Sequence, residues 1–285
     1  MKDVTNAMRA HILTAAVPYI KQYTDQYVVV KYGGNAMIDE ELKKSVMKDL
    51  MLLQLVGVKV VLVHGGGPAI NSTLDAMKIE SHFANGLRVT DEATMDVVQM
   101  VLAGKVNKGL VADLTDLGGK AVGLCGVDGN MIQVHKQNDE LGCVGSIDTI
   151  DTSIIDDVIS RGYIPVISSI GMGADGKTYN INADTVAAKI AGALKAETMV
   201  AMTNIDGVLR DVHDPSSLIS KITMAEADQL KAEGIIAGGM IPKVDCCLEA
   251  IKSGAQKVFI INGEIPHAIL IELLTDEGLG TMFVK

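Results

Sequence analysis

Two strand–glycine turn–helix units near the start of the chain constrain its fold most strongly. Residues 27–30 (YVVV) form a β-branched run before Gly33 and Gly34, and residues 39–56 then carry an amphipathic helical pattern. Residues 58–63 form a second apolar run, which His64, three glycines and a proline follow. Apolar strands that alternate with helices are typical of a mostly parallel sheet covered on both faces. The sequence therefore predicts an α/β fold, a three-layer sandwich around a mostly parallel open sheet.

The rest of the pattern predicts an N-terminal helix and two lobes. A length of 285 residues suggests about two domains. Residues 1–25 predict a helix interrupted near Pro18, and an apolar strand restarts at residues 198–202. We therefore place an N-terminal lobe at residues 26–195 and a C-terminal lobe at residues 196–285. The shorter elements that we expect are hairpins at 81–89 and 120–147, helices at 90–102, 104–117 and 183–194, a strand at 163–169, and a capping box at 223–226.

The charge of the chain argues against a nucleic-acid partner. The net charge is −10, whereas phosphate backbones are bound by basic surfaces. The four cysteines show neither a CxxC pair nor zinc-finger spacing, so we expect reduced thiols in a cytoplasmic protein. No segment approaches the roughly 18 apolar residues of a membrane span. The sequence thus predicts a protein that binds neither nucleic acid nor membrane.

One segment matches a nucleotide-binding motif that its context does not support. Residues 171–178 (GMGADGKT) fit the P-loop pattern GxxxxGK[ST]. A P-loop needs a helix to begin at its Lys-Thr pair, but an extended-looking stretch follows here. The better helix start is Asn182, and Asp175-Gly176 is typical of a hairpin turn. We therefore predict a β-hairpin in place of a P-loop.

The two glycine turns and a nearby lysine indicate an anion site. Glycine turns between a strand and a helix let backbone N–H groups approach an anion closely. Lys31 ends the first strand immediately before its turn, which would direct its ammonium group into the same crevice. The alternatives are tight connections without function and an ordinary surface lysine. Both turns at strand ends of one domain favour a ligand site.

Other polar residues lie where a ligand site would need them. Arg88, in a turn before a helix, could hold a carboxylate through two hydrogen bonds or cap the surface. Asn180, Asn182 and Asp184 form an N-x-N-x-D pattern, of which helix capping readily explains one residue. Lys243 begins a helix, where the dipole disfavours a cation, so an anionic ligand opposite it is a reasonable hypothesis.

Together these segments resemble the acetylglutamate kinases, a branch of the amino-acid kinase family. The matching segments are residues 31–36 (KYGGNA), 64–68 (HGGGP), 85–91 (NGLRVTD), 180–184 (NINAD), 203–208 (TNIDGV) and 238–243 (GGMIPK). They occur in family order and span almost the whole chain, and NGLRVTD and GGMIPK are the more specific ones. Two positions depart from the pattern: Val127, where many relatives have lysine, and Ala69, where a polar residue is common.

The resemblance implies ATP-dependent phosphorylation of the γ-carboxylate of N-acetyl-L-glutamate, a step of arginine biosynthesis. Lys31 and Lys243 would flank the transferred phosphoryl group, and Asp184 would organise both lysines by ion pairing. The backbone amides of four glycines would stabilise its oxygens: Gly33, Gly34, Gly66 and Gly67. Because the acceptor carboxylate is already ionised near neutral pH, no general base is needed.

The resemblance also assigns the two substrates to separate lobes. Arg88, Asn180 and Asn182, with the Gly66 and Gly67 amides, would bind N-acetyl-L-glutamate. The C-terminal lobe would hold the nucleotide through Thr203, Asn204, Ile205, Asp206 and Lys243. Mg²⁺ would be bound by the ATP phosphates, with no ligand from a protein side chain.

The chain ends resemble the arginine-inhibited members of this branch. In those enzymes a similar N-terminal helix interlaces dimers into a hexamer, a trimer of dimers. The resemblance places an L-arginine effector site at Tyr19, Lys195, His267, Glu277 and Gly280. The alternative is an N-terminal helix that packs only on its own subunit.

Three other functions remain open at this point. Aspartokinase and glutamate 5-kinase are related, but their additional domains have no room in 285 residues. A non-catalytic sensor could keep the fold, although Lys31, Lys243 and Asp184 are all present. An oxidoreductase that binds NAD is disfavoured because neither turn has the GxGxxG spacing.

Overall fold

The computed structural model describes residues 5–84 and 86–285, apart from the side chain of Asn35. Residues 1–4 of the predicted N-terminal helix and Asn85 of the NGLRVTD segment lie outside this range. The main sheet has eight strands in the order β12-β14-β13-β11-β1-β2-β8-β5. Its strands are β1 (Tyr27–Tyr32), β2 (Lys59–His64), β5 (Ala121–Cys125), β8 (Ile164–Ser168), β11 (Thr198–Thr203), β12 (Lys221–Thr223), β13 (Lys257–Asn262) and β14 (Thr281–Val284).

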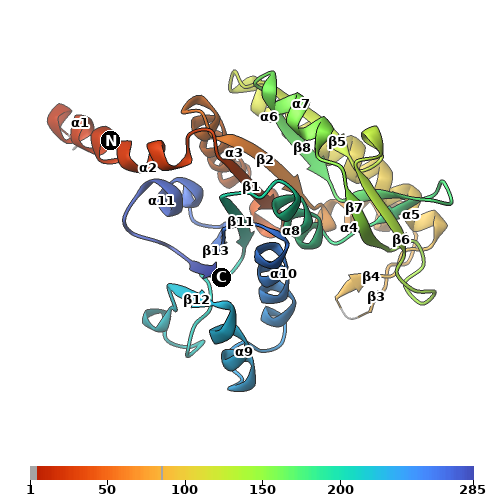
Figure 1. Ribbon diagram of the computed structural model, residues 1–285. Helices are drawn as coiled ribbons and strands as arrows, with labels where there is room; N and C mark the ends of the chain where they lie inside the picture. Colours follow the sequence, from red (N-terminus) through yellow and green to blue (C-terminus); the bar gives the residue numbers. More distant parts are fainter. Residues whose placement is uncertain (1–4, 85) are drawn as a thin grey trace.

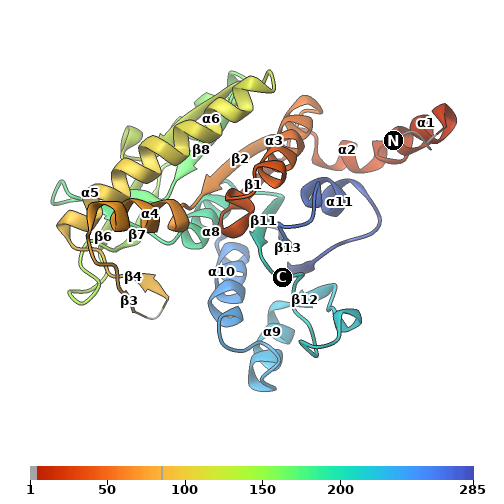
Figure 2. The same ribbon diagram turned by 180° about the vertical axis from the view of Figure 1, so that it is seen from behind.

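The sheet is mostly parallel, and helices cover both of its faces (Figures 1 and 2). Among the described strands of this sheet, only the β13–β14 pairing is antiparallel. One face is covered by α3 (Glu40–Leu55), α6 (Asn107–Asp116) and α11 (Ala268–Leu274), and the other by α7 (Ser153–Ser160), α8 (Ala183–Ala193) and α10 (Met240–Ser253). Successive β1 residues alternate between the two cores, since Val28 and Val30 join one and Val29 the other. The predicted fold class is confirmed.

Residues between 83 and 180 form two smaller sheets. A four-stranded sheet contains β6 (Ile132–Lys136), β7 (Gly145–Ile150), β9 (Ile170–Gly173) and β10 (Thr178–Asn180), and a hairpin joins β3 (Phe83–Ala84) to β4 (Leu87–Arg88). Strands β9 and β10 pair antiparallel around Gly176, whose φ of 75° suits a tight turn. This confirms the predicted hairpin at the segment that matches the P-loop pattern.

Two local predictions need correction. The hairpin predicted at residues 120–147 is only partly right, because β5 joins the main sheet beside β8 and only β6 and β7 form the hairpin. The helices predicted at 90–102 and 104–117 are one continuous rod, in which a π-helical segment, Met100–Val106, joins α5 (Glu92–Gln99) to α6. The predicted break at residue 103 therefore lies within this π-helical segment.

The remaining helices are α1 (Asn6–Ala15), α2 (Val17–Tyr23), α4 (Gly67–Met77) and α9 (Met224–Ala232). The break between α1 and α2 confirms the interruption predicted near Pro18, and Thr223 with Glu226 forms the predicted capping box of α9. Helix α1 has no buried residue and projects from the body (Figure 1). Among the described residues, no helix is long and apolar enough to span a bilayer.

Candidate active site

Both glycine turns border one cavity at the carboxyl ends of neighbouring strands. Tyr32 and His64, the last residues of β1 and β2, are partners in the parallel ladder, so the turns that follow them lie side by side. The cavity has a volume of about 300 Å³ and is bordered by Gly33, Gly34 and the three glycines at 65–67. The carboxyl edge of an open α/β sheet is the usual location of ligands.

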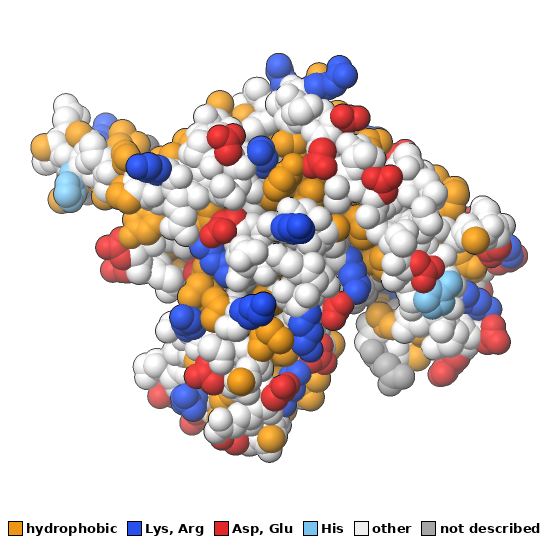
Figure 3. Space-filling view, viewed as in Figure 1, with side chains coloured by type: hydrophobic (Ala, Val, Ile, Leu, Met, Phe, Trp, Pro, Cys, Tyr) orange, Lys and Arg blue, Asp and Glu red, His pale blue; other side chains and the backbone are white. Residues whose placement is uncertain are grey.

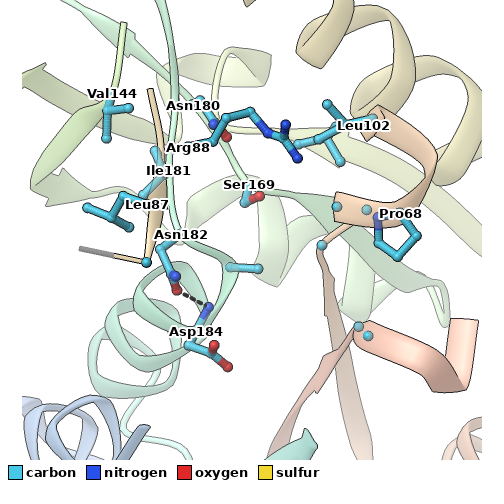
Figure 4. Close-up of a pocket in the computed structure, with 18 of the residues that line it drawn as sticks. Pro68, Leu87, Arg88, Leu102, Val144, Ser169, Asn180, Ile181, Asn182 and Asp184 are labelled. Carbon is cyan, nitrogen blue, oxygen red and sulfur yellow. Dashed lines mark hydrogen bonds between the residues drawn. The ribbon is translucent and has the colours of Figure 1, made fainter. Parts of the chain in front are cut away.

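An ion pair lies on one side of this cavity. Lys31, at the end of β1, has its Nζ 2.9 Å from Oδ1 of Asp184 in the first turn of α8. Asn182 is the N-cap of α8, because its side chain accepts the backbone N–H groups of Asp184 and Thr185 (Figure 4). Capping therefore explains Asn182, which also borders the cavity, whereas Lys31 and Asp184 supply paired charges beside the glycine turns.

Arg88 lies on the opposite side, held by residues that the sequence did not single out. Its guanidinium group donates to Asn71 Oδ1 at 2.5 Å and to the Ser81 hydroxyl, and it stacks over the Phe83 ring with 4.7 Å to the ring centroid. Burial lowers the pKa of Arg88 from its ordinary value. Asn71 lies on α4, so no local pattern connects it with Arg88. These contacts hold the Arg88 guanidinium group at the cavity, and they leave some of its five N–H donors for a ligand.

Asn180 is fixed to the same wall through Thr90. The Asn180 side chain donates to Thr90 Oγ1 at 3.2 Å, and the Thr90 hydroxyl donates to the Arg88 carbonyl at 2.8 Å. Thr90 is fully buried, so this connection lies behind the cavity. Arg88 and Asn180 thus occupy one end of the cavity, with Asp184 at the other (Figure 4).

A side chain at position 66 would meet the side chain of Leu102. A Cβ atom at this position would lie 2.6 Å from Leu102 Cδ2, closer than real contacts allow. Leu102 belongs to the π-helical segment, so this segment packs directly against the second glycine turn. A larger residue at position 66 would therefore require Leu102 to move.

The predicted nucleotide residues lie at the same edge of the sheet but outside this cavity. Thr203 ends β11, and Asp206 accepts a hydrogen bond of 2.8 Å from Asn262 at the end of β13. Lys243 lies in the first turn of α10, and no ion pair within 4.0 Å joins it to Asp184. Asn204 and Ile205 belong to the same loop as Asp206. The space-filling view shows an indentation between the part of the chain that carries α10 and the part that carries β6 and β7 (Figure 3).

The predicted effector residues each have neighbours of their own. Tyr19 on α2 donates to Asp276, beside Glu277. His267 lies 2.6 Å from Asp49 of α3 and borders a different surface hollow. Gly280 packs on the Ile260 carbonyl in β13, whereas Lys195 lies near the opposite end of that strand, where Ala196 accepts the N–H of Gln256. Tyr19 is in direct contact with the segment around Glu277.

Within the described residues, no group of three or more His, Cys, Asp or Glu side chains could hold a metal ion. The charges at the cavity are instead the cations Lys31 and Arg88 and the carboxylate of Asp184. This donor set suits an anionic ligand, and backbone N–H groups of the glycine turns add to it.

His64 should make the protein sensitive to acid. Burial lowers its pKa from 6.5 to about 4, although its bond to the Gly65 carbonyl acts in the opposite direction. The unfolded chain therefore binds a proton at His64 more readily than the folded protein does. The contribution of neutral His64 to the free energy of unfolding is complete above pH 6.5 and is lost as the pH falls toward 4. The His64→Asn variant lacks this titrating group. We expect its free energy of unfolding to fall by on the order of 3 kcal/mol less than that of the wild type over this pH range. Urea unfolding at pH 7 and pH 4.5 measures the difference, and equal pH dependence in both proteins would contradict it.

Comparison with known proteins identifies the family. The Amino acid kinase family matches residues 26–262. The chain is 52% identical over 287 residues to an acetylglutamate kinase of Brachyspira hyodysenteriae, with 100% of both chains covered. It is 54% identical over 275 residues to an acetylglutamate kinase of Clostridium kluyveri, which covers 96% of this chain and 97% of that one.

A solved structure agrees with this assignment. The structure of N-acetylglutamate synthase from Neisseria gonorrhoeae, complexed with coenzyme A and N-acetyl-glutamate, matches with a TM-score of 0.84 at 27% identity. The match covers 97% of this chain and 63% of the longer synthase chain. The family match, the identity over the full length and the shared architecture all agree. The chain belongs to the Amino acid kinase family and, within it, to the acetylglutamate kinases.

Proposed function

We propose that the protein transfers the γ-phosphoryl group of ATP to the γ-carboxylate of N-acetyl-L-glutamate, a step of arginine biosynthesis. The observation that carries this proposal is one cavity that joins the Lys31–Asp184 pair, two glycine turns and Arg88. Arg88 suits a substrate carboxylate, and the lysine with the glycine amides suits a phosphoryl group. The names of the acetylglutamate kinase relatives support the same substrate.

Catalysis in this proposal is positioning together with charge neutralisation. A γ-carboxylate with an ordinary pKa near 4 is already a nucleophile at neutral pH, so no residue has to remove a proton. Lys31 stabilises the negative charge of the transferred group, and Asp184 holds the ammonium in place at 2.9 Å. The amides of Gly33, Gly34, Gly66 and Gly67 donate to its oxygens.

The nucleotide is assigned to the C-terminal lobe. Thr203 ends β11, and Asn204, Ile205 and Asp206 follow it. Because β11 is adjacent to β1 in the sheet, this loop lies beside the first glycine turn. Because Lys243 makes no ion pair with Asp184 in this structure, we propose that it reaches the phosphoryl group when the two lobes close. Mg²⁺ would be carried by the ATP phosphates and would neutralise part of their charge.

Release of ADP tests the substrate assignment against its rivals. We expect turnover with N-acetyl-L-glutamate and little with glutamate, aspartate or uridylate. The reason is that Arg88 and Asn180 are fixed at one end of a small cavity, at a set distance from Lys31. A preference for another acceptor would assign the protein to a different kinase activity, and no turnover with any acceptor would support a non-catalytic sensor.

We further propose inhibition by L-arginine in a hexamer built as a trimer of dimers. Its support is the N-terminal segment: α1 has no buried residue, and its Met8, Ile12 and Leu13 are 53%, 57% and 71% exposed. Figure 3 shows apolar side chains on this projecting helix. Tyr19 and Glu277 lie close enough to form one side of an effector site, because Tyr19 already contacts the neighbouring Asp276. Lys195, His267 and Gly280 would contribute its other sides.

Removal of residues 1–16 should convert the hexamer into a dimer and abolish arginine inhibition. The cut stops before α2 because Tyr23 at the end of α2 is buried and its loss would damage the fold. Ile12→Glu should have the same effect, whereas Ala10→Glu on the opposite side of α1 serves as the control. Light scattering and ADP release with and without arginine measure both effects. A dimer at full length, or a truncated hexamer, would contradict the proposal.

A further inference from the structure

His64 and Asn107 form a buried polar pair directly beneath the second glycine turn. His64 is the last residue of β2 and is 0% exposed, and Asn107 at the start of α6 is 1% exposed. The His64 ring contacts the Gly65 carbonyl through Nδ1 at 2.8 Å and Asn107 Nδ2 through Nε2 at 3.1 Å. Buried polar side chains are costly unless they are hydrogen-bonded, so a pair in this position requires an explanation.

The contacts of Asn107 determine the tautomer of His64. The Asn107 amide nitrogen also lies within hydrogen-bond distance of the carbonyls of Val166 at 2.8 Å and Leu124 at 3.3 Å, so its two hydrogens are shared among these carbonyls and the His64 ring. A flipped amide would direct its oxygen at both carbonyls, so the nitrogen must face them and the His64 ring. Nε2 of His64 therefore accepts a hydrogen bond, and the ring proton lies on Nδ1, where it donates to the Gly65 carbonyl.

This hydrogen bond determines the orientation of the Gly65–Gly66 peptide. In a trans peptide the C=O and the next N–H point in opposite directions, and no peptide among the described residues is cis. With its carbonyl held toward His64, the peptide directs the Gly66 N–H away from the ring. This N–H has no acceptor among the described residues, and Gly66 borders the cavity that contains Lys31 and Asp184.

The π-helical segment holds both ends of this arrangement. The backbone N–H of Asn107 donates to the Leu102 carbonyl, five residues earlier, as π-helical bonding requires. Leu102 of this segment packs on Gly66, and Asn107, the residue that follows the segment, contacts His64. The π-helical turn thus places an apolar and a polar side chain against the second glycine turn. π-Helical turns occur frequently at functional sites.

We propose that His64 and Asn107 are positioning residues for phosphoryl transfer: the Nδ1–H of His64 holds the Gly65 carbonyl so that the Gly66 N–H faces the anionic ligand. This inference rests on the proposed kinase function, because the ligand at Gly66 is the transferred group or its acceptor. His64 itself touches neither ligand. It acts through one peptide, and Asn107 acts by fixing the tautomer.

Two isosteric substitutions of His64 separate positioning from packing. The Nδ2 atom of Asn can occupy the place of Nδ1 and donate to Gly65, whereas Gln places its amide near Nε2 and leaves Gly65 without this donor. We expect His64→Gln to lower kcat by on the order of a hundredfold, as for a lost transition-state donor. His64→Asn should stay within roughly tenfold of the wild type, the effect of one neutral hydrogen bond.

Three controls keep the outcomes distinct. Leu114→Val, at a buried position on the same helix α6, should lower the melting temperature without changing kcat. Wild-type ADP release tests the kinase function itself, so an inactive wild type would contradict that function and not the tautomer. Long-range ¹H–¹⁵N NMR correlations of the His64 ring should show protonated Nδ1 in wild type and protonated Nε2 or a mixture in Asn107→Leu. Equal losses of kcat in the Asn and Gln variants, or an Nε2-protonated wild type, would overturn the proposal.

Discussion

Lys31→Ala should lower kcat by at least about a hundredfold, the cost of removing a donor that acts on transition-state charge. Lys31 is 9% exposed and has its Nζ 2.9 Å from Asp184, so its loss also leaves that carboxylate unpaired beside the glycine turns. Lys31→Arg should also be poor, because a broad planar fork cannot replace a compact ammonium at the same place. Single-turnover and steady-state ADP release measure the effect.

A matched control exists on the same helix as Asp184. Lys189 of α8 pairs with Glu249 of α10 at 2.6 Å, away from the cavity. Lys189→Ala removes another ion pair of α8, this one to α10, and should leave kcat nearly unchanged. Lys243→Ala should behave like Lys31→Ala if lobe closure brings it to the phosphoryl group. Near-normal turnover in either the Lys31 or the Lys243 variant would contradict the catalytic assignment of that lysine.

Arg88→Ala should raise the KM for N-acetyl-L-glutamate strongly, on the order of a hundredfold for two charge-assisted hydrogen bonds. The KM for ATP should stay nearly constant, because the nucleotide is assigned to the other side of the glycine turns. Arg88→Lys should recover only part of the affinity, since one ammonium cannot form a bidentate pair. Initial-rate measurements with each substrate varied in turn separate the two constants.

The residues around Arg88 provide graded variants. Asn71→Ala should raise the same KM more mildly, because Asn71 only holds the guanidinium group. Asn180→Ala should also raise the KM for N-acetyl-L-glutamate, but by less than Arg88→Ala, because a hydrogen bond from a neutral amide contributes less than one from a charged group. Equal changes in the KM values for N-acetyl-L-glutamate and ATP would show that Arg88 does not belong to the N-acetyl-L-glutamate subsite.

Local signals in the sequence were sufficient for the parts of the fold that depend on neighbouring residues. The glycine turns follow apolar runs, and the N-cap of α8 at Asn182 and the capping box at Thr223 are short-range patterns. The hairpin at Gly176 was predictable for the same reason, because turn chemistry outweighed a match to the P-loop pattern. Each of these features is decided within about five residues of chain.

Features that depend on tertiary register were not predictable in this way. The pairing of β5 with β8 joins residues about 40 positions apart in the chain, and no local pattern indicates it. We therefore assigned β5 to a hairpin with its neighbour in sequence. Asn71 and Ser81 gave no signal, since only the folded chain brings them to Arg88. The role of Asn107 depends on a π-helical turn, which the period of apolar residues does not reveal.

Identification of the phosphorylated group tests the central claim most directly. The protein would be incubated with Mg-ATP and N-acetyl-L-glutamate, and hydroxylamine would trap any acyl phosphate as a hydroxamate for mass spectrometry. The account predicts a hydroxamate at the γ-carboxyl group, formed in step with ADP and formed at least about a hundredfold more slowly by Lys31→Ala. ADP release without a hydroxamate, or a hydroxamate at the α-carboxyl group, would contradict it.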